Sequence, residues 1–200
     1  EFRRVLFRSS ANPMIEALRR HRQRPCVKVL NKADIADPVV TAEWLAALGS
    51  QKDVRAVAIS AKDAAATRRV PALAAALVPH RDSALKPVRI LIMGIPNVGK
   101  STFINALLGR KVAKTGDEPA VTRMQSRHRL DTRTEVIDMP GLMWPKVEHE
   151  SDGLMLAASH AIGENAYVEE EVAEYLAGVL AERYPGLLER RYGIDPSQHD

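Results

Sequence analysis

Short apolar runs alternate along the chain with longer segments in which apolar residues recur at helical spacing. Residues 26–30, 54–59 and 88–93 are mostly apolar, which predicts strands buried on both faces. Residues 134–137 form a shorter run, and residues 125–130 alternate polar and apolar side chains as an edge strand does. The pattern predicts an α/β fold around an open sheet.

The segments between and after the strands have helical spacing. Asn12 followed by Pro13 is typical of an N-cap and a first helical residue, and predicts a helix that ends near residue 22. Further helices are expected over residues 38–48, 70–77, 102–108, 153–161 and 168–181. The last of them is expected to stop before Pro185 and Gly186.

Residues 94–101 read Gly-Ile-Pro-Asn-Val-Gly-Lys-Ser and lie between a predicted strand and a predicted helix. This is the context of a Walker A loop, whose glycines let backbone N–H groups curve around phosphates. Lys100 would reach the outer phosphates, and the Ser101 hydroxyl would bind magnesium. The alternative, a glycine turn before an ordinary amphipathic helix, is disfavoured by the strand and helix on either side. The residues expected to contact GTP here are Asn97, Val98, Gly99, Lys100, Ser101 and Thr102.

A second motif, Asn31-Lys32-Ala33-Asp34, follows the first predicted strand, at the strand end where ligands bind in open α/β sheets. The Asp34 carboxylate can accept hydrogen bonds from the ring N–H and the exocyclic amine of guanine, a pair of donors that adenine lacks. Asn31 would brace the loop, and the Lys32 stem would pack on the base. The motif therefore predicts recognition of guanine.

Two further motifs follow predicted strands. Ser60-Ala61-Lys62 would supply the Ala61 N–H to the guanine carbonyl. Asp138 would hold magnesium through water, and Gly141 would offer its N–H to the γ-phosphate. Each motif alone is an ordinary turn, but four of them at four strand ends predict a guanine-nucleotide site.

Base recognition precedes phosphate binding in this chain, as in a circularly permuted GTPase. Residues 10–185 resemble the YlqF/RbgA family through Asn12-Pro-Met, the phosphate loop, Lys114-Thr-Gly with Pro119-Ala-Val-Thr122, and Asp138-Met-Pro-Gly-Leu-Met-Trp-Pro-Lys146. The resemblance implies a P-loop GTPase three-layer fold, circularly permuted, followed by part of a C-terminal helical domain. It also implies a GTP-hydrolysing factor that acts late in assembly of the large ribosomal subunit.

The resemblance also assigns roles to single residues. Thr122 would be the switch threonine that reaches magnesium and the γ-phosphate, although Ala120 replaces the glycine of the family motif. Asn97 would help to hold potassium. Leu142 stands where Ras-like enzymes carry a water-orienting glutamine, and the family is thought to use a histidine from an N-terminal segment instead. The expected catalytic residues are Lys100, Thr122 and Gly141, and the expected magnesium ligands are Ser101, Thr122 and Asp138.

Three regions are expected along the chain. Residues 1–9 fit no helical or strand period and resemble translated cloning sequence, residues 10–146 form the GTPase domain, and residues 147–200 form part of a helical domain. The family topology has a strand before the Asn12 helix, between the phosphate-loop strand and the Asn31 strand, and only residues 5–7 could replace it. We therefore expect a gapped sheet and a reduced stability.

The net charge of +4 hides a strong asymmetry. Residues 1–145 hold 25 Lys and Arg against 13 Asp and Glu, a net of +12, whereas residues 146–200 hold 4 against 12, a net of −8. A basic first part fits a polyanionic partner. Seven positive residues gather on the switch loop and edge hairpin, namely Arg110, Lys111, Lys114, Arg123, Arg127, Arg129 and Arg133. Given the resemblance, we favour contact with rRNA phosphates over a merely charged edge strand.

The expected partners are the large ribosomal subunit and rRNA, and the expected cofactors are GTP or GDP, Mg²⁺ and K⁺. We expect no membrane partner, since no apolar run reaches 18 residues. We also expect a cytoplasmic monomer with no DNA partner. One alternative is a GTP-gated rRNA-binding scaffold with negligible turnover. The permuted GTPases of the small subunit are disfavoured because they carry an oligonucleotide-binding barrel or zinc cysteines, whereas Cys26 is the single cysteine here.

Overall fold

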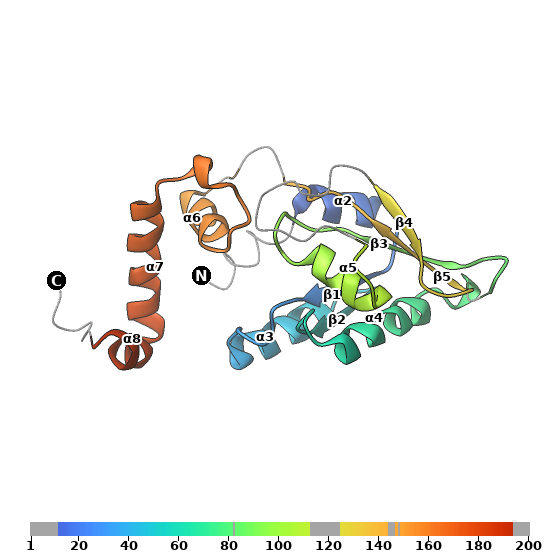
Figure 1. Ribbon diagram of the computed structural model, residues 1–200, viewed down its shortest axis with the longest axis horizontal. Coiled ribbons are helices and arrows are strands. Elements are labelled where there is room, and N and C mark those ends of the chain that lie inside the picture. Colours follow the sequence, from blue (N-terminus) through green and yellow to red (C-terminus); the bar gives the residue numbers. More distant parts are fainter. Residues whose placement is uncertain (1–11, 82, 113–124, 144–146, 148, 194–200) are drawn as a thin grey trace. The chain divides into compact units, whose positions relative to one another are not determined.

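The computed structural model describes residues 12–81, 83–112, 125–143, 147 and 149–193. These fall into two compact units that separate after residue 143 (Figure 1). Several features discussed above lie outside the described residues, namely residues 1–9, Lys114, the segment from Pro119 to Thr122, Arg123, Trp144 and Lys146.

The first unit has the expected α/β composition. Its strands are β1 (Cys26–Leu30), β2 (Val54–Ala58), β3 (Val88–Ile92), β4 (Ser126–Arg129) and β5 (Thr134–Asp138). Its helices are α2 (Pro13–His21), α3 (Pro38–Gly49), α4 (Ala64–Ala76) and α5 (Lys100–Leu108), with a 3-10 turn at Pro79–Arg81. Every predicted strand is confirmed, with ends that differ by at most one residue. The expected burial on both faces is wrong, because β1 is only partly buried along its whole length and β3 exposes Arg89 and Leu91 at the edge of a small sheet.

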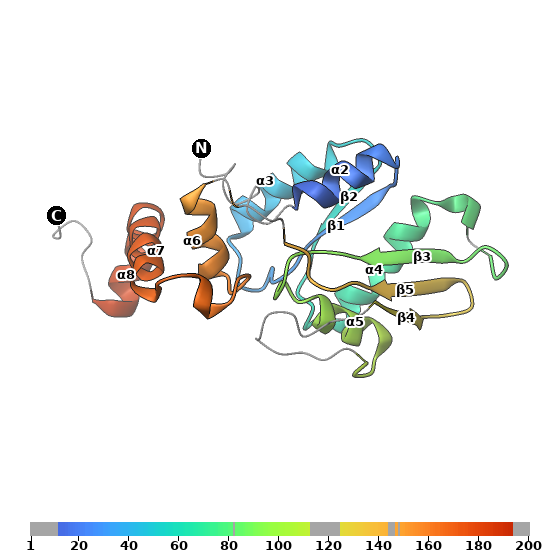
Figure 2. The same ribbon diagram turned by 90° about the horizontal axis from the view of Figure 1, so that it is seen from above.

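The five strands form two sheets (Figure 2). β1 pairs with β2 in parallel, while β3 pairs with β5 in parallel and β4 pairs with β5 antiparallel. Within the described residues no ladder joins β1 to β3, so each of these two strands has one edge without a strand partner. Among the described residues, the two sheets are therefore separate at the place where the resemblance implies a gap.

One hydrophobic core nevertheless spans both sheets. Val70 of α4, with Phe103, Ile104 and Leu107 of α5, packs with Val136 of β5. Partly buried residues of the first sheet join the same cluster, namely Val27, Val29 and Val57. Packing against α4 and α5, rather than strand pairing, therefore holds the loops after β1 and β2 near the loop after β3.

Helix α4 begins earlier than expected. The predicted start at residue 70 is wrong, because Asp63 caps the helix by accepting the N–H groups of Ala65 and Ala66 at 2.8 and 3.1 Å. Pro71 lies inside the helix. A proline is unfavourable in a helix interior, which is why the sequence pattern suggested a start beside it. The Asp63 cap and the alanines that follow outweigh that preference.

The second unit is helical, as the fold prediction required. It contains α6 (Glu150–Ala158), a 3-10 turn at Glu164–Ala166, α7 (Glu169–Arg183) and α8 (Pro185–Tyr192). Two predictions are wrong. Helix α6 lies three residues before the expected range of 153–161. Pro185 was expected only to end a helix, but it also starts α8, because proline is tolerated at the first position of a helix. Across the described parts of the chain, no helix combines the length and apolarity that a membrane span needs.

Candidate nucleotide-binding site

One asparagine joins three of the four predicted loops. Asn31, just after β1, donates a hydrogen bond from Nδ2 to the Val98 carbonyl at 2.8 Å, and its Oδ1 accepts the Ala61 N–H at 2.9 Å. A Cβ at Gly99 would collide with Asn31 Nδ2, and Gly99 has φ of 90°, so this position requires glycine. A single side chain, that of Asn31, thus connects the loop that is predicted to recognise the base with the Ser60 loop and the phosphate loop.

The part of the site that is predicted to bind the guanine base contains the Asp34 carboxylate, with Ser60 and Lys62 beside it. The Ser60 hydroxyl beside Asp34 lowers the pKa of that carboxyl, and the nearby Lys62 ammonium lowers it further. Lys62 Nζ lies 3.7 Å from Asp34 Oδ2. An ionised acceptor at an exposed strand end suits a ligand edge with two N–H donors. The Ala61 N–H that the sequence assigned to the guanine carbonyl is bonded to Asn31, so a carbonyl would have to share or replace that bond.

The phosphate loop is folded around its lysine. Lys100, at the start of α5, donates from Nζ to the Ile95 carbonyl at 2.6 Å across the loop. Burial lowers the pKa of Lys100, and the charge of Asp138 partly opposes that shift. Asn97 has φ of 55°, and Ser101 and Thr102 continue the first turn of α5. The loop therefore presents an ammonium group and a helix N-terminus together, the combination that binds phosphates.

A buried carboxylate lies beside this lysine. Asp138, the last residue of β5, is 1% exposed, and among the described residues its Oδ1 has no hydrogen-bond partner. Burial raises the pKa of Asp138, while the Lys100 and His128 charges lower it. A buried oxygen without a partner fits a divalent cation, and Ser101 supplies a hydroxyl ligand of the type that magnesium prefers. The described residues hold no cluster of three or more His, Cys, Asp or Glu, so the fit relies on these oxygens and a ligand's phosphates.

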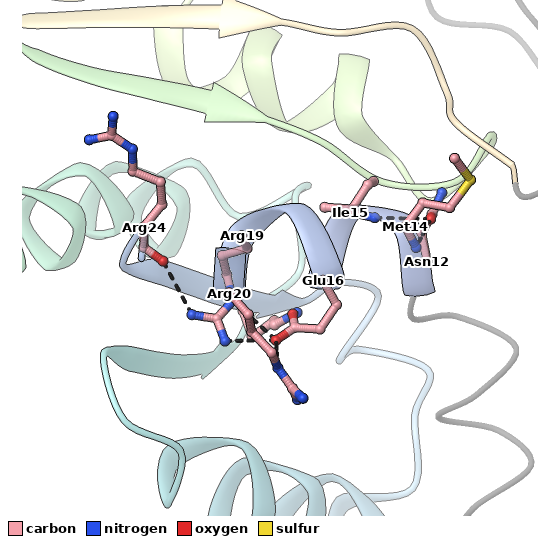
Figure 3. Close-up of polar contacts among 8 residues, drawn as sticks. Asn12, Met14, Ile15, Glu16, Arg19, Arg20 and Arg24 are labelled. Carbon is pink, nitrogen blue, oxygen red and sulfur yellow. Dashed lines mark hydrogen bonds and ion pairs between the residues drawn. The ribbon is translucent and has the colours of Figure 1, made fainter. Parts of the chain in front are cut away.

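The loop after β5 is fastened on both sides. The Leu142 N–H donates to the Gly94 carbonyl at 3.1 Å, and the Leu142 carbonyl accepts a hydrogen bond from Asn12 Nδ2 at 2.8 Å. A Cβ at Gly141 would lie 2.9 Å from Pro96, so Gly141 is packed directly on the phosphate loop. The contact of Asn12 was missed from the sequence, where this residue signalled only a helix cap. Figure 3 shows Asn12 at the start of α2.

Sequence reasoning also missed the surroundings of Asp138 on the neighbouring strand. Ser126 pairs with Asp138 in the ladder, and Ser126 Oγ lies 2.9 Å from His128 Nε2. The alternation of β4 could have placed these two side chains on the inward face. Arg127 and Arg129 take the exposed positions of the same strand.

Comparisons with known proteins identify the family of this chain. The family model described as a 50S ribosome-binding GTPase matches residues 89–178. Ribosome biogenesis GTPase A of Bacillus pumilus is 39% identical over 96% of this chain and 70% of its own length, and that of Bacillus cereus is 37% identical over 96% and 66%.

Solved structures show the same fold. The GDP-bound and GNP-bound structures of YlqF from T. maritima each match 78% of this chain with a TM-score of 0.54 and 22% identity. The match covers 59% and 58% of those chains, and this chain spans about two thirds of the length of the curated relatives. The identity over most of the Bacillus pumilus relative confirms the expectation from the motifs: the chain belongs to the ribosome biogenesis GTPase A family.

Proposed function

We propose that this chain binds guanine nucleotide, hydrolyses GTP, and serves assembly of the large ribosomal subunit in the cytoplasm. The observation that supports this most directly is the Asn31 side chain, which holds the base loops and the phosphate loop together. A site that joins a base-recognising carboxylate to a phosphate loop suits a nucleotide rather than a free phosphate. Membership of the family supports the reaction and the assembly role.

Guanine is selected by Asp34 in this proposal. Its low pKa keeps the carboxylate ionised, so that it accepts from both donors of the guanine edge while adenine leaves it unpaired. The Lys32 stem covers the base, and the Ala61 N–H meets the guanine carbonyl after sharing or exchanging its bond with Asn31.

The chemistry is an in-line attack of water on the γ-phosphate. Magnesium, when bound, would neutralise developing charge on the phosphate oxygens. Ser101, Asp138 and Thr122 are the residues that would hold it. Lys100 places its ammonium on the outer phosphates, and the Gly141 N–H donates to the γ-phosphate. Leu142 stands at the position of the water-orienting glutamine of Ras-like enzymes and has no polar side-chain atom. Another group must therefore orient the attacking water.

A monovalent cation and an RNA partner complete the proposal. Asn97, held in the left-handed region within the phosphate loop, would help to bind potassium beside the phosphates. Arg127 and Arg129 on the exposed face of β4 would contact rRNA phosphates, with the chain acting as a monomer. Replacing potassium by sodium should reduce multiple-turnover phosphate release, and equal rates in the two salts would refute the potassium role of Asn97.

The first test is a competition experiment. Fluorescent GDP is titrated onto the chain in magnesium and potassium, and then displaced with unlabelled GDP or ADP. We expect ADP to compete at least about 100-fold more weakly, because adenine lacks the pair of donors that guanine presents to the Asp34 carboxylate. Equal competition by the two nucleotides would refute guanine selection by Asp34.

A further inference from the structure

The N-cap of α2 makes a contact that capping does not need. Asn12 is 7% exposed, and its Oδ1 accepts the N–H groups of Met14 and Ile15 at 3.0 and 3.2 Å (Figure 3). Its Nδ2 donates to the Leu142 carbonyl, 130 positions away in the sequence. The amide therefore uses its acceptor for its own helix and its donor for the loop after β5.

The donor contact completes the fixing of one residue, Leu142, through both of its backbone polar groups. The Leu142 N–H is held by the Gly94 carbonyl and the Leu142 carbonyl by Asn12. Gly141 immediately precedes Leu142 and lies against Pro96. The backbone path that orients the Gly141 N–H is therefore limited on one side by Pro96 and on the other by the two anchors of Leu142, Gly94 from the phosphate loop and Asn12 from α2.

Helix α2 is itself fastened to the first sheet. Glu16 Oε2 lies 2.8 Å from Lys28 Nζ of β1, while Glu16 Oε1 pairs with Arg19 Nη2 at 2.7 Å and Arg20 Nε at 3.0 Å. These three cations hold the pKa of Glu16 at about 2. Contacts thus run from β1 through α2 to the loop after β5, across the gap between the two sheets.

We infer that Asn12 is a positioning residue that pre-organises the Gly141 N–H for the γ-phosphate. The inference rests on the proposed function, since it concerns the same nucleotide site. A diphosphate makes no contact at the γ-position, so the anchor contributes to binding of GTP but not of GDP. Asn12 then sets the preference between the two nucleotides without touching either.

Two substitutions separate this role from helix capping. Asn12→Asp keeps an equally good N-cap but replaces the donor by a carboxylate facing the Leu142 carbonyl. Asn12→Ser also caps, without a charge, and its side chain is too short to keep both contacts. The matched control is Asp37→Asn, which exchanges carboxylate for amide at the N-cap of α3, where the side chain accepts the Val39 and Val40 N–H groups.

The measurement is the ratio of affinities for the β,γ-imido analogue of GTP and for GDP, by displacement of fluorescent GDP. We expect both Asn12 variants to lose about 3- to 10-fold in analogue affinity, the equivalent of one hydrogen bond, with GDP affinity nearly unchanged. Both variants should also unfold at a lower temperature, because the Leu142 carbonyl loses its donor, so affinities are measured well below the transition. Asp37→Asn should leave the ratio unchanged.

Each other outcome has a definite meaning. An unchanged ratio in both variants, or an equal loss for GDP and the analogue, would overturn the positioning role. Failure of the unsubstituted chain to bind GDP would overturn the proposed function and this inference with it. A normal GDP affinity in the unsubstituted chain with no ratio change in the variants would overturn the inference alone.

Discussion

Hydrogen bonds from single polar side chains connect parts of the first unit that no backbone ladder joins among the described residues. Asn31 joins the loops after β1, β2 and β3, and Asn12 joins α2 to the loop after β5. Each uses both ends of its amide: Asn31 donates to one loop and accepts from another, whereas Asn12 donates to a loop and accepts from the first turn of its own helix. A carboxylate or hydroxyl at either position would keep only part of this bridge.

Asn31→Ala should weaken nucleotide binding even though Asn31 acts mainly by holding the loops together rather than by contacting the nucleotide. The substitution leaves the Val98 carbonyl and the Ala61 N–H without their partner, so the loops are free to separate. We expect GDP affinity to fall by about 10- to 100-fold and the free energy of unfolding by about 1 to 3 kcal/mol. Titration and denaturant unfolding measure the two effects. Ser50→Ala, which removes an exposed hydroxyl at the end of α3, is the control, and GDP affinity as high as in that control would exclude the bridge as a determinant of binding.

Glu16 predicts a pH dependence of stability. Its folded pKa of about 2 lies below the ordinary value of 4.5, so its ion pairs stabilise the fold above about pH 4.5 and are lost as the pH falls towards 2. We expect Glu16→Gln to lower the free energy of unfolding by about 1 to 2 kcal/mol at pH 7, allowing for solvent screening. Urea unfolding between pH 7 and pH 2.5 should show the difference shrinking below pH 4.5. A constant difference over that range would contradict the assignment.

At the scale of elements, the sequence predicts what is local. The strands could be located within one residue because four of them are apolar runs bounded by polar turns and β4 lies in an alternating segment. The start of α4 could not, because Pro71 inside the helix gives a stronger signal for a helix start than Asp63, the residue that caps it. The four loop motifs could be identified from their spacing, but the contact of Asn12 with Leu142 could not, since it depends on how helix and loop pack.

The edge strand β4 carries its own prediction. Arg127 and Arg129 both take exposed positions, and reversing both charges to Glu should weaken binding to large ribosomal subunits and lower the salt slope by about 2. The control is Arg190→Glu with Arg191→Glu on α8, which changes the net charge equally. Filter binding at several salt concentrations gives both quantities. Equal weakening in the two double variants would indicate a general charge effect and no RNA contact at β4.

At the scale of the whole molecule, the first unit is basic and the second acidic, and the first has a divided sheet. Apolar side chains next to the division are unusually accessible: Met14 and Leu18 of α2 are 60% and 54% exposed, and Leu91 of β3 is 48% exposed. Among the described residues, α4, α5 and a few bridging polar side chains join the two sheets where no ladder does.

Supplying a strand between β1 and β3 should therefore stabilise the fold. We expect the segment that the family resemblance places before Asn12, joined to residue 12, to raise the unfolding temperature by about 10 °C or more, since each kcal/mol is worth about 2 to 4 °C at this size. The added strand would pair with the free edges of β1 and β3 and bury Leu91. The same segment with a proline in the middle of the strand is the control, because proline removes a ladder donor in a central strand. Calorimetry that finds the same transition temperature with and without the intact segment would show that α4 and α5 already suffice to hold the two sheets together.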